Sequence, residues 1–121
     1  MFKKGITEDK HPAKEGLNHW RLQRITAIAL IPLTVWFVVS VATLPSASYT
    51  ETKEWISNPA IAILITFFSI TSLYHASLGV QVIIEDYIHI ETLNKFALIG
   101  SKIIFTTLGA IALIAIGTIV F

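Results

Sequence analysis

Three long apolar runs restrict the folds that this chain can adopt. Each is long enough to cross a bilayer as a helix, which takes about 20 residues; they are Ile25 to Leu44, Ala60 to Ile84 and Ala97 to Phe121. The chain is 54% hydrophobic and 14% charged, whereas a soluble domain carries about 25% charged residues. We therefore predict an all-α membrane protein, in which a polar segment (1–24) precedes a domain of three transmembrane helices (25–121).

The basic residues are distributed unevenly between the two sides of the predicted helices. Of nine lysines and arginines, eight lie before the first run or beside the loop that precedes the third, and one, Lys53, lies in the other loop. The positive-inside rule then puts the N-terminus inside and Phe121 outside. Residues 1–18 lack apolar periodicity, so we expect an extended inner segment that can dock onto a partner. A polar start at Met1 favours a bacterial inner membrane over the mitochondrial inner membrane.

Several classes of chemistry are excluded from this polypeptide. It contains no cysteine, which removes disulfides and iron–sulfur clusters from this chain, though not from its partners. It has no Gly-rich phosphate loop, no nucleophile–base arrangement and no zinc-ligand spacing. Its net charge of +1 gives no reason to expect nucleic acid as a partner. The short outer loop shows no chemistry, although Trp55 fits a surface helix turn there.

His75 is an ionisable residue in the middle of the second apolar run. Such residues are costly in hydrocarbon and usually mark a functional site, and imidazole is an axial ligand of haem iron. On a helix, His75 shares an arc of about 80° with four other residues, which are Ser72, Gly79, Val82 and Asp86. Gly79 leaves bare backbone one turn away, where a flat ligand could approach. The stripe therefore links a buried ligand to an acid about 16 Å further along, near the membrane surface.

The polar residues near the inner surface have two interpretations each. Tyr87 and Asp86 fit an interfacial pocket with a hydrogen-bond donor and a proton-relaying or arginine-paired acid, but they also fit a helix end that meets water. Arg24 fits a partner of an anionic cofactor group, since a guanidinium forks onto carboxylates, and it fits a headgroup anchor equally well. His89 could share protons with these groups, and nothing singles out His11 for a metal role.

Two functional alternatives remain open on the residues alone. A lone membrane histidine can simply hydrogen-bond a neighbouring helix, in which case the chain is a small structural or regulatory subunit without a cofactor. The chain could also be a component of a proton-coupled transporter that uses His75 and Asp86 as relay groups. Haem absorbance after purification separates a haem protein from both.

The segment from His75 to Tyr87 resembles a signature of the small hydrophobic membrane-anchor subunit of succinate dehydrogenase, respiratory complex II. In that family a haem-ligating His is followed four residues later by Gly, and eleven and twelve residues later by Asp-Tyr; all four positions match here. The stretch from His19 to Ala27 also resembles the family's entry to its first helix. The patterns of the sister anchor subunit of the same complexes, Ser-x-Arg-Pro and His-x-x-x-Gly-x-Arg-His, do not occur.

This resemblance implies a role for each matched residue. His75 would be one of two axial ligands of haem b, and the second membrane-anchor subunit would supply the other. Tyr87 would hydrogen-bond ubiquinone, with Asp86 supporting that site, and Arg24 and His19 would contact the haem propionates. The chain would form half of a heterodimeric anchor bundle and would hold the flavoprotein and iron–sulfur subunits to the membrane. It would serve electron transfer from succinate to quinone in the tricarboxylic acid cycle and respiratory chain as a non-flavin subunit of the enzyme complex, and the sequence leaves open whether the chain has activity on its own.

The charge asymmetry predicts the orientation of the chain. Because native cysteine is absent, single-cysteine variants can be labelled in intact cells without background. We expect Lys3→Cys to be protected from an impermeant thiol reagent on the outer side, and Lys53→Cys to react with it. Outer-side labelling at position 3 would overturn both the topology and the docking of a soluble partner at this end.

Overall fold

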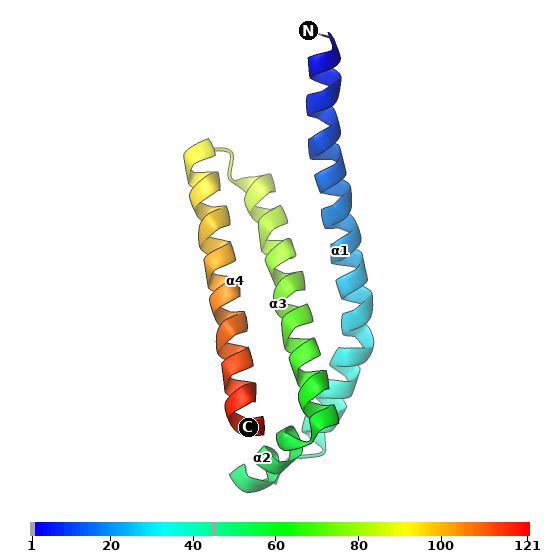
Figure 1. Ribbon diagram of the computed structural model, residues 1–121, viewed down its shortest axis with the longest axis vertical. Helices are drawn as coiled ribbons and strands as arrows, with labels where there is room; N and C mark the ends of the chain where they lie inside the picture. Colours follow the sequence, from blue (N-terminus) through cyan, green and yellow to red (C-terminus); the bar gives the residue numbers. More distant parts are fainter. Residues whose placement is uncertain (1, 45) are drawn as a thin grey trace.

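The chain folds into four α-helices. The computed structural model describes residues 2–44 and 46–121, and the side chains of residues 16–44 and 46–121. The helices, shown in Figure 1, are α1 (Phe2–Ala42), α2 (Tyr49–Ser57), α3 (Pro59–Tyr87) and α4 (Glu91–Val120). Three segments are long and apolar enough to cross a membrane, namely Gly16–Ala42, Pro59–Tyr87 and Glu91–Val120. The described residues contain no strand, and the prediction of an all-α membrane protein with three spans is confirmed.

The helices extend beyond the apolar runs that predicted them. The expectation of an extended segment over residues 1–18 was wrong, because α1 is helical from Phe2 onward; Met1 lies outside the described residues. An established helix gains one hydrogen bond for each residue that it adds, so it continues through polar sequence outside the bilayer. Similarly, α4 begins at Glu91 rather than near residue 97, with an acidic side chain in its first turn, where the helix dipole favours it. An apolar run therefore marks the span better than it marks the helix end.

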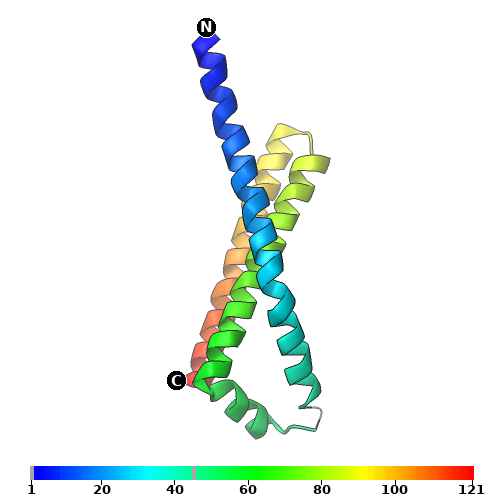
Figure 2. The same cartoon turned by 90° about the vertical axis from the view of Figure 1, so that its right-hand side faces the viewer.

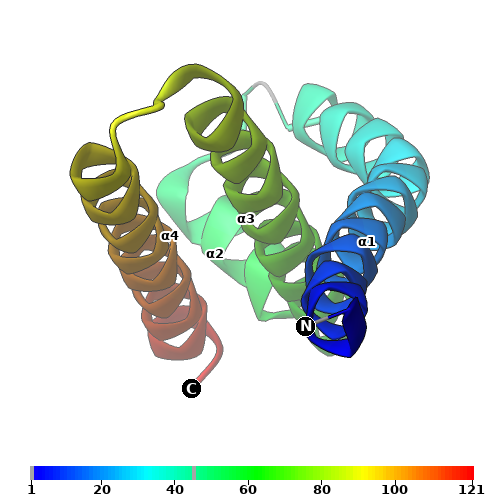
Figure 3. The ribbon, with the colours of Figure 1, turned by 90° about the horizontal axis from the view of Figure 1, so that it is seen from above.

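Helix α3 lies in the middle of the arrangement. It packs against both α1 and α4, whereas α1 and α4 do not contact one another within the described part of the chain. Figure 3 shows this order from above, and Figure 2 shows that α1 crosses α3 obliquely. The N-terminus and the α3–α4 connection lie toward one end of the molecule, and α2 and the C-terminus lie at the other (Figure 1).

Specific contacts fix the three long helices against one another. Phe37 of α1 stacks on Phe68 of α3 with ring centroids 4.8 Å apart. On the other side of α3, Leu73 reaches the backbone of α4 at Gly109, where an added Cβ would meet its Cδ1 at 3.8 Å. A small residue at this position lets membrane helices approach closely.

Helix α2 closes the end of the molecule opposite the N-terminus. Its capping box joins Ser48 and Glu51, each of whose side chains bonds the backbone N–H of the other. Trp55 stacks on Trp36 of α1 with centroids 6.4 Å apart, and the hydroxyl of Ser57 donates to the carbonyl of Ile119 at 3.3 Å. The expected helix turn at Trp55 is thus a full short helix that ties α1 to α4.

The three long helices form an open layer with little interior of its own. Within the described residues the buried side chains are few: Leu33, Thr71, Leu78, Ile84 and Ala62. Most large apolar side chains on the spans are exposed in the isolated chain. In a bilayer these surfaces face lipid or another membrane chain. They can do so because each helix satisfies its own backbone groups and the apolar side chains need no water.

Candidate functional site

The polar stripe of α3 is carried on one uninterrupted helix. The side chain of Asn58 caps its start by accepting from the N–H of Ala60 at 3.0 Å, and Pro59 occupies the first turn, where proline is favoured. Because the helix then runs unbroken to Tyr87, Ser72, His75 and Gly79 hold the register that the sequence predicted. All three are half-buried in the isolated chain.

His75 is tied to α1 by a hydrogen bond. Its Nδ1 lies 2.9 Å from Oγ1 of Thr26, in a part-buried position. The same hydroxyl lies 2.7 Å from the carbonyl oxygen of Leu22 and 3.0 Å from that of Gln23. No hydrogen bond joins Nε2 of His75 to another residue within the described part of the chain, so the second ring nitrogen remains available for a ligand.

The surface of α3 beside His75 is open. A Cβ added to Gly79 would meet no neighbouring atom within 4 Å. Gly79 lies one turn from His75, at roughly 40° around the helix, so the bare backbone and the imidazole border the same face. This arrangement fits a flat macrocycle that approaches α3 from outside the chain and takes one axial nitrogen from His75.

Among the described residues there is no group of three or more His, Cys, Asp or Glu side chains that could hold a metal ion. Haem does not require such a group, because the porphyrin supplies four nitrogens and the protein supplies only axial ligands. A single imidazole with one free nitrogen could therefore serve as such a ligand.

His19 belongs to a second polar cluster, closer to the α3–α4 connection. Its Nε2 lies 3.4 Å from Nε2 of Gln81, which also donates to Oε1 of Glu85 at 3.1 Å. His19 precedes Thr26 by seven residues, close to two turns, so both side chains lie on the α3-facing side of α1, about 10 Å apart. A cavity of about 310 Å³ borders this cluster. His19 is thus near His75 along the helix pair without touching it.

Arg24 is on another side of α1. It lies two residues from Thr26, which places it roughly 200° around the helix from the side that faces α3. Its guanidinium carbon stands 4.6 Å from the ring centroid of Trp20, a cation–π contact within the helix. The structure therefore does not bring Arg24 together with His75, although the family resemblance assigns both to the haem.

Asp86 and Tyr87 form the exposed end of α3. Tyr87 is 78% exposed, and Asp86 is exposed beside it. The helix end is held by Asn94 of α4, whose amide donates to the carbonyl oxygens of Ile84 at 3.3 Å and Ile88 at 2.9 Å. The bond to Ile88 satisfies a carbonyl beyond the last helical turn, and the carbonyl of Ile84 also accepts the backbone N–H of Ile88 at 2.9 Å. Together these bonds fix where the acid and the phenol emerge.

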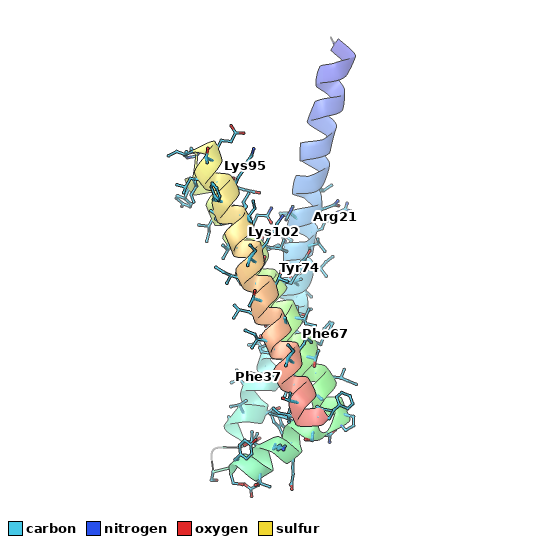
Figure 4. The ribbon with its side chains drawn as sticks, turned by 60° about the vertical axis from the view of Figure 1, so that its left-hand side comes forward. Arg21, Phe37, Phe67, Tyr74, Lys95 and Lys102 are labelled. Atoms are coloured by element: carbon cyan, nitrogen blue, oxygen red, sulfur yellow. The ribbon has the colours of Figure 1, made fainter. Side chains whose placement is uncertain are left out.

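The remaining histidines do not join these clusters. His89 is exposed in the short connection between α3 and α4, and the side chain of His11 lies outside the described residues. Lys95 and Lys102 of α4 and Arg21 of α1 lie in the half of the molecule toward the α3–α4 connection (Figure 4), and Lys95 pairs with Glu91 at 3.5 Å.

Three site residues were missed by reasoning from the sequence. Thr26 stands within the stretch that carried the family resemblance, and its spacing of seven from His19 was a usable signal. Gln81 is an amide one turn before Glu85 in an otherwise apolar segment, which was also a signal. Asn94 gave none, because nothing local shows that a residue in one helix reaches back to cap another.

Comparison with known proteins supports the resemblance. Residues 8–118 match the family model described as succinate dehydrogenase/fumarate reductase transmembrane subunit. The chain is 38% identical over 102 residues to the succinate dehydrogenase hydrophobic membrane anchor subunit of Rickettsia bellii (strain RML369-C), covering 84% of this chain and 81% of that one. For the succinate dehydrogenase membrane anchor subunit of Reclinomonas americana the identity is 35% over 81 residues, covering 64% and 68%.

A third relative extends the match over more of the chain. The succinate dehydrogenase hydrophobic membrane anchor subunit of Paracoccus denitrificans is 29% identical over 113 residues, covering 89% of this chain and 87% of that protein. No solved structure matches the chain.

Proposed function

The chain belongs to the succinate dehydrogenase/fumarate reductase transmembrane subunit family, and from this we propose that it helps to bind haem b and ubiquinone in a succinate:quinone oxidoreductase. The observation that carries the proposal is His75, held by Thr26 through one ring nitrogen with the other free, beside the open backbone of Gly79. In this role the chain anchors the catalytic subunits to the membrane and contributes to electron transfer from succinate to quinone.

Haem b, when bound, supplies a carrier of single electrons. His75 would hold the haem iron through the ring nitrogen that Thr26 leaves free, together with a residue of the second membrane-anchor subunit. Gly79 leaves room for the macrocycle. His19 lies on the same side of α1 as Thr26 and contacts a propionate. Arg24 contacts one only after it leaves the ring of Trp20, against which it now rests.

Ubiquinone binds at the exposed end of α3. Its two-electron reduction consumes two protons, and its oxygens become more negative as electrons arrive. The hydroxyl of Tyr87 donates a hydrogen bond to one carbonyl oxygen and strengthens that bond as the charge develops. Asp86, exposed beside it, relays a proton from water or holds a partner's arginine. Asn94 keeps both in place by capping α3.

This end of the molecule faces the inner side of a bacterial cytoplasmic membrane in our proposal, with the mitochondrial inner membrane as the alternative. The described basic residues Arg21, Lys95 and Lys102 lie toward the same end as the α3–α4 connection (Figure 4), which is the distribution that the positive-inside rule relates to the inner side. Relatives from Rickettsia and Paracoccus support a bacterial source. The iron–sulfur and flavoprotein subunits dock at this end and deliver electrons to the quinone.

His75→Ala is expected to remove or shift the low-spin b-type haem spectrum of the purified complex. Loss of an axial nitrogen changes the ligand field even where another ligand substitutes, so the midpoint potential changes as well. His89→Ala is the matched control, because that imidazole is exposed in a connection, and its spectrum should equal the wild type. An unchanged spectrum and potential in His75→Ala would exclude this residue as a ligand.

Tyr87→Phe is expected to lower quinone reduction roughly 10- to 1000-fold, because it removes only the hydroxyl that stabilises the developing oxyanion. Succinate oxidation with an artificial acceptor that draws electrons from the soluble subunits should be unchanged. Tyr74→Phe, within the same helix, controls for loss of a phenol elsewhere and should reduce quinone normally.

Asp86→Asn extends this test by removing the charge while retaining the shape. Quinone reduction should fall and become dependent on added buffer if the acid relays protons, but fall without that dependence if it pairs with an arginine.

Wild-type quinone reduction in Tyr87→Phe would mean that the quinone site lies elsewhere.

The chain is expected to require a second membrane-anchor subunit. Ser72 and His75 lie half-buried on α3 beside the bare backbone of Gly79, and Thr26 partners only Nδ1 of His75. A polar group that faces lipid without a partner, as Nε2 would, is costly. Expression of this chain alone should therefore give low yield and no stoichiometric haem, whereas coexpression with the second anchor subunit should restore both, as measured by detergent chromatography and haem absorbance. A stable, haem-free monomer would instead favour a structural subunit without a cofactor.

A further inference from the structure

We propose that Thr26 is a positioning residue for His75: its hydroxyl accepts a hydrogen bond from Nδ1–H and so fixes the tautomer in which Nε2 is free to bind iron. This inference rests on the proposed role of His75 as a haem ligand. It adds a residue of α1, in a different element of the fold, to the determinants of that site.

The direction of the hydrogen bond follows from the single proton of a threonine hydroxyl. Oγ1 of Thr26 lies 2.7 Å from the carbonyl oxygen of Leu22, four residues earlier, and 3.0 Å from that of Gln23. Threonine hydroxyls in helices commonly donate to such carbonyls. With its proton directed there, Oγ1 presents lone pairs to His75, whose Nδ1 lies 2.9 Å away. The imidazole is then the donor.

This direction determines what the other ring nitrogen can do. A neutral imidazole carries one N–H and one bare nitrogen. With the proton on Nδ1, the lone pair is on Nε2, which is the nitrogen without a hydrogen bond in the described part of the chain. Histidines that bind metals almost always donate their other N–H to an acceptor, which fixes the ring orientation and raises the basicity of the ligating nitrogen. The opposite direction would put the proton on Nε2 and remove the lone pair that iron needs.

The position of Thr26 is itself held by packing. Its contact with His75 joins the two helices that cross in Figure 2. Eleven residues further along α1, close to three turns, Phe37 stacks on Phe68 with an interplanar angle of 17°. Two contacts on the same side of α1 fix how that helix is rotated against α3. The hydroxyl therefore meets the imidazole at a defined place rather than through chance contact.

The inference is tested in the assembled complex with variants that separate the hydroxyl from the shape of the side chain. Thr26→Val retains the shape and removes the acceptor, and Thr26→Ser retains the acceptor. Thr34→Val is the control, because Thr34 is exposed on the same helix. The readouts are haem retained on dilution, the electron paramagnetic resonance signature of low-spin ferric haem, and the haem midpoint potential.

Thr26→Val should weaken haem retention about 10- to 100-fold, shift the low-spin signature and raise the midpoint potential. The potential rises because a less basic Nε2 stabilises ferric iron less. Thr26→Ser should restore all three to near wild type, and Thr34→Val should leave them unchanged. If Thr26→Val fails to assemble, Thr26→Ala, which lacks the hydroxyl and relieves any crowding, is compared with Thr26→Ser in the same way.

Two outcomes overturn the inference, and a third identifies a deeper failure. Wild-type haem retention, signature and potential in Thr26→Val would show that the hydroxyl does not act on His75. Equal losses in the valine and serine variants would show that shape matters and the acceptor does not. In both cases, loss of the haem spectrum in His75→Ala would leave the proposed function standing. An unchanged spectrum in His75→Ala would overturn the ligand assignment, and the role of Thr26 with it.

Discussion

The hydrocarbon core of a bilayer offers backbone N–H and C=O groups no water to bond, and the fold of this chain depends on that constraint. A segment that crosses must have every backbone group satisfied, and a continuous apolar run of about 20 residues satisfies its own as a helix. Each long apolar run is accordingly one uninterrupted helix. The helix ends are where other groups become necessary: Asn58 caps the start of α3, and Asn94 bonds carbonyls at its end.

The same constraint makes the polar side chains within the spans informative. His75 and Thr26 lie on different helices, and each offers the other a partner that lipid cannot. Their hydrogen bond offsets part of the cost of placing an imidazole in α3, and it also orients the ring. A bond to Nδ1 leaves Nε2 free, so in the proposed function the interaction that makes the histidine tolerable in the membrane also prepares it as a ligand. Structure and function are therefore linked at one contact.

The layer of three helices is open on the side of α3 that carries Gly79, where a ligand of His75 would approach. Helix α3 is covered by α1 and α4 on two sides, while the surface at Gly79 has no neighbour within 4 Å. A second membrane chain would bury that surface and enclose a cofactor between the two chains. The exposed Asp86 and Tyr87 lie at the end of the same helix, toward the basic residues of α1 and α4 (Figure 4). In the proposed function one helix thus serves the haem along its length and the quinone at its end.

The sequence by itself determined the three spans, the stripe of α3 and the family, because hydrophobic length and residue spacing along one helix are local properties that the backbone geometry converts directly into positions. It did not determine how far α1 continues through polar sequence, since the length of an apolar run does not define where a helix begins. Only the tertiary structure decided which side of α1 meets α3. That rotation brought Thr26 to His75 and His19 to Gln81, and it left Arg24 against Trp20 on another side. Such pairings depend on how side chains of two helices interlock, as Phe37 and Phe68 do, and this packing is not encoded in the spacing of either helix alone.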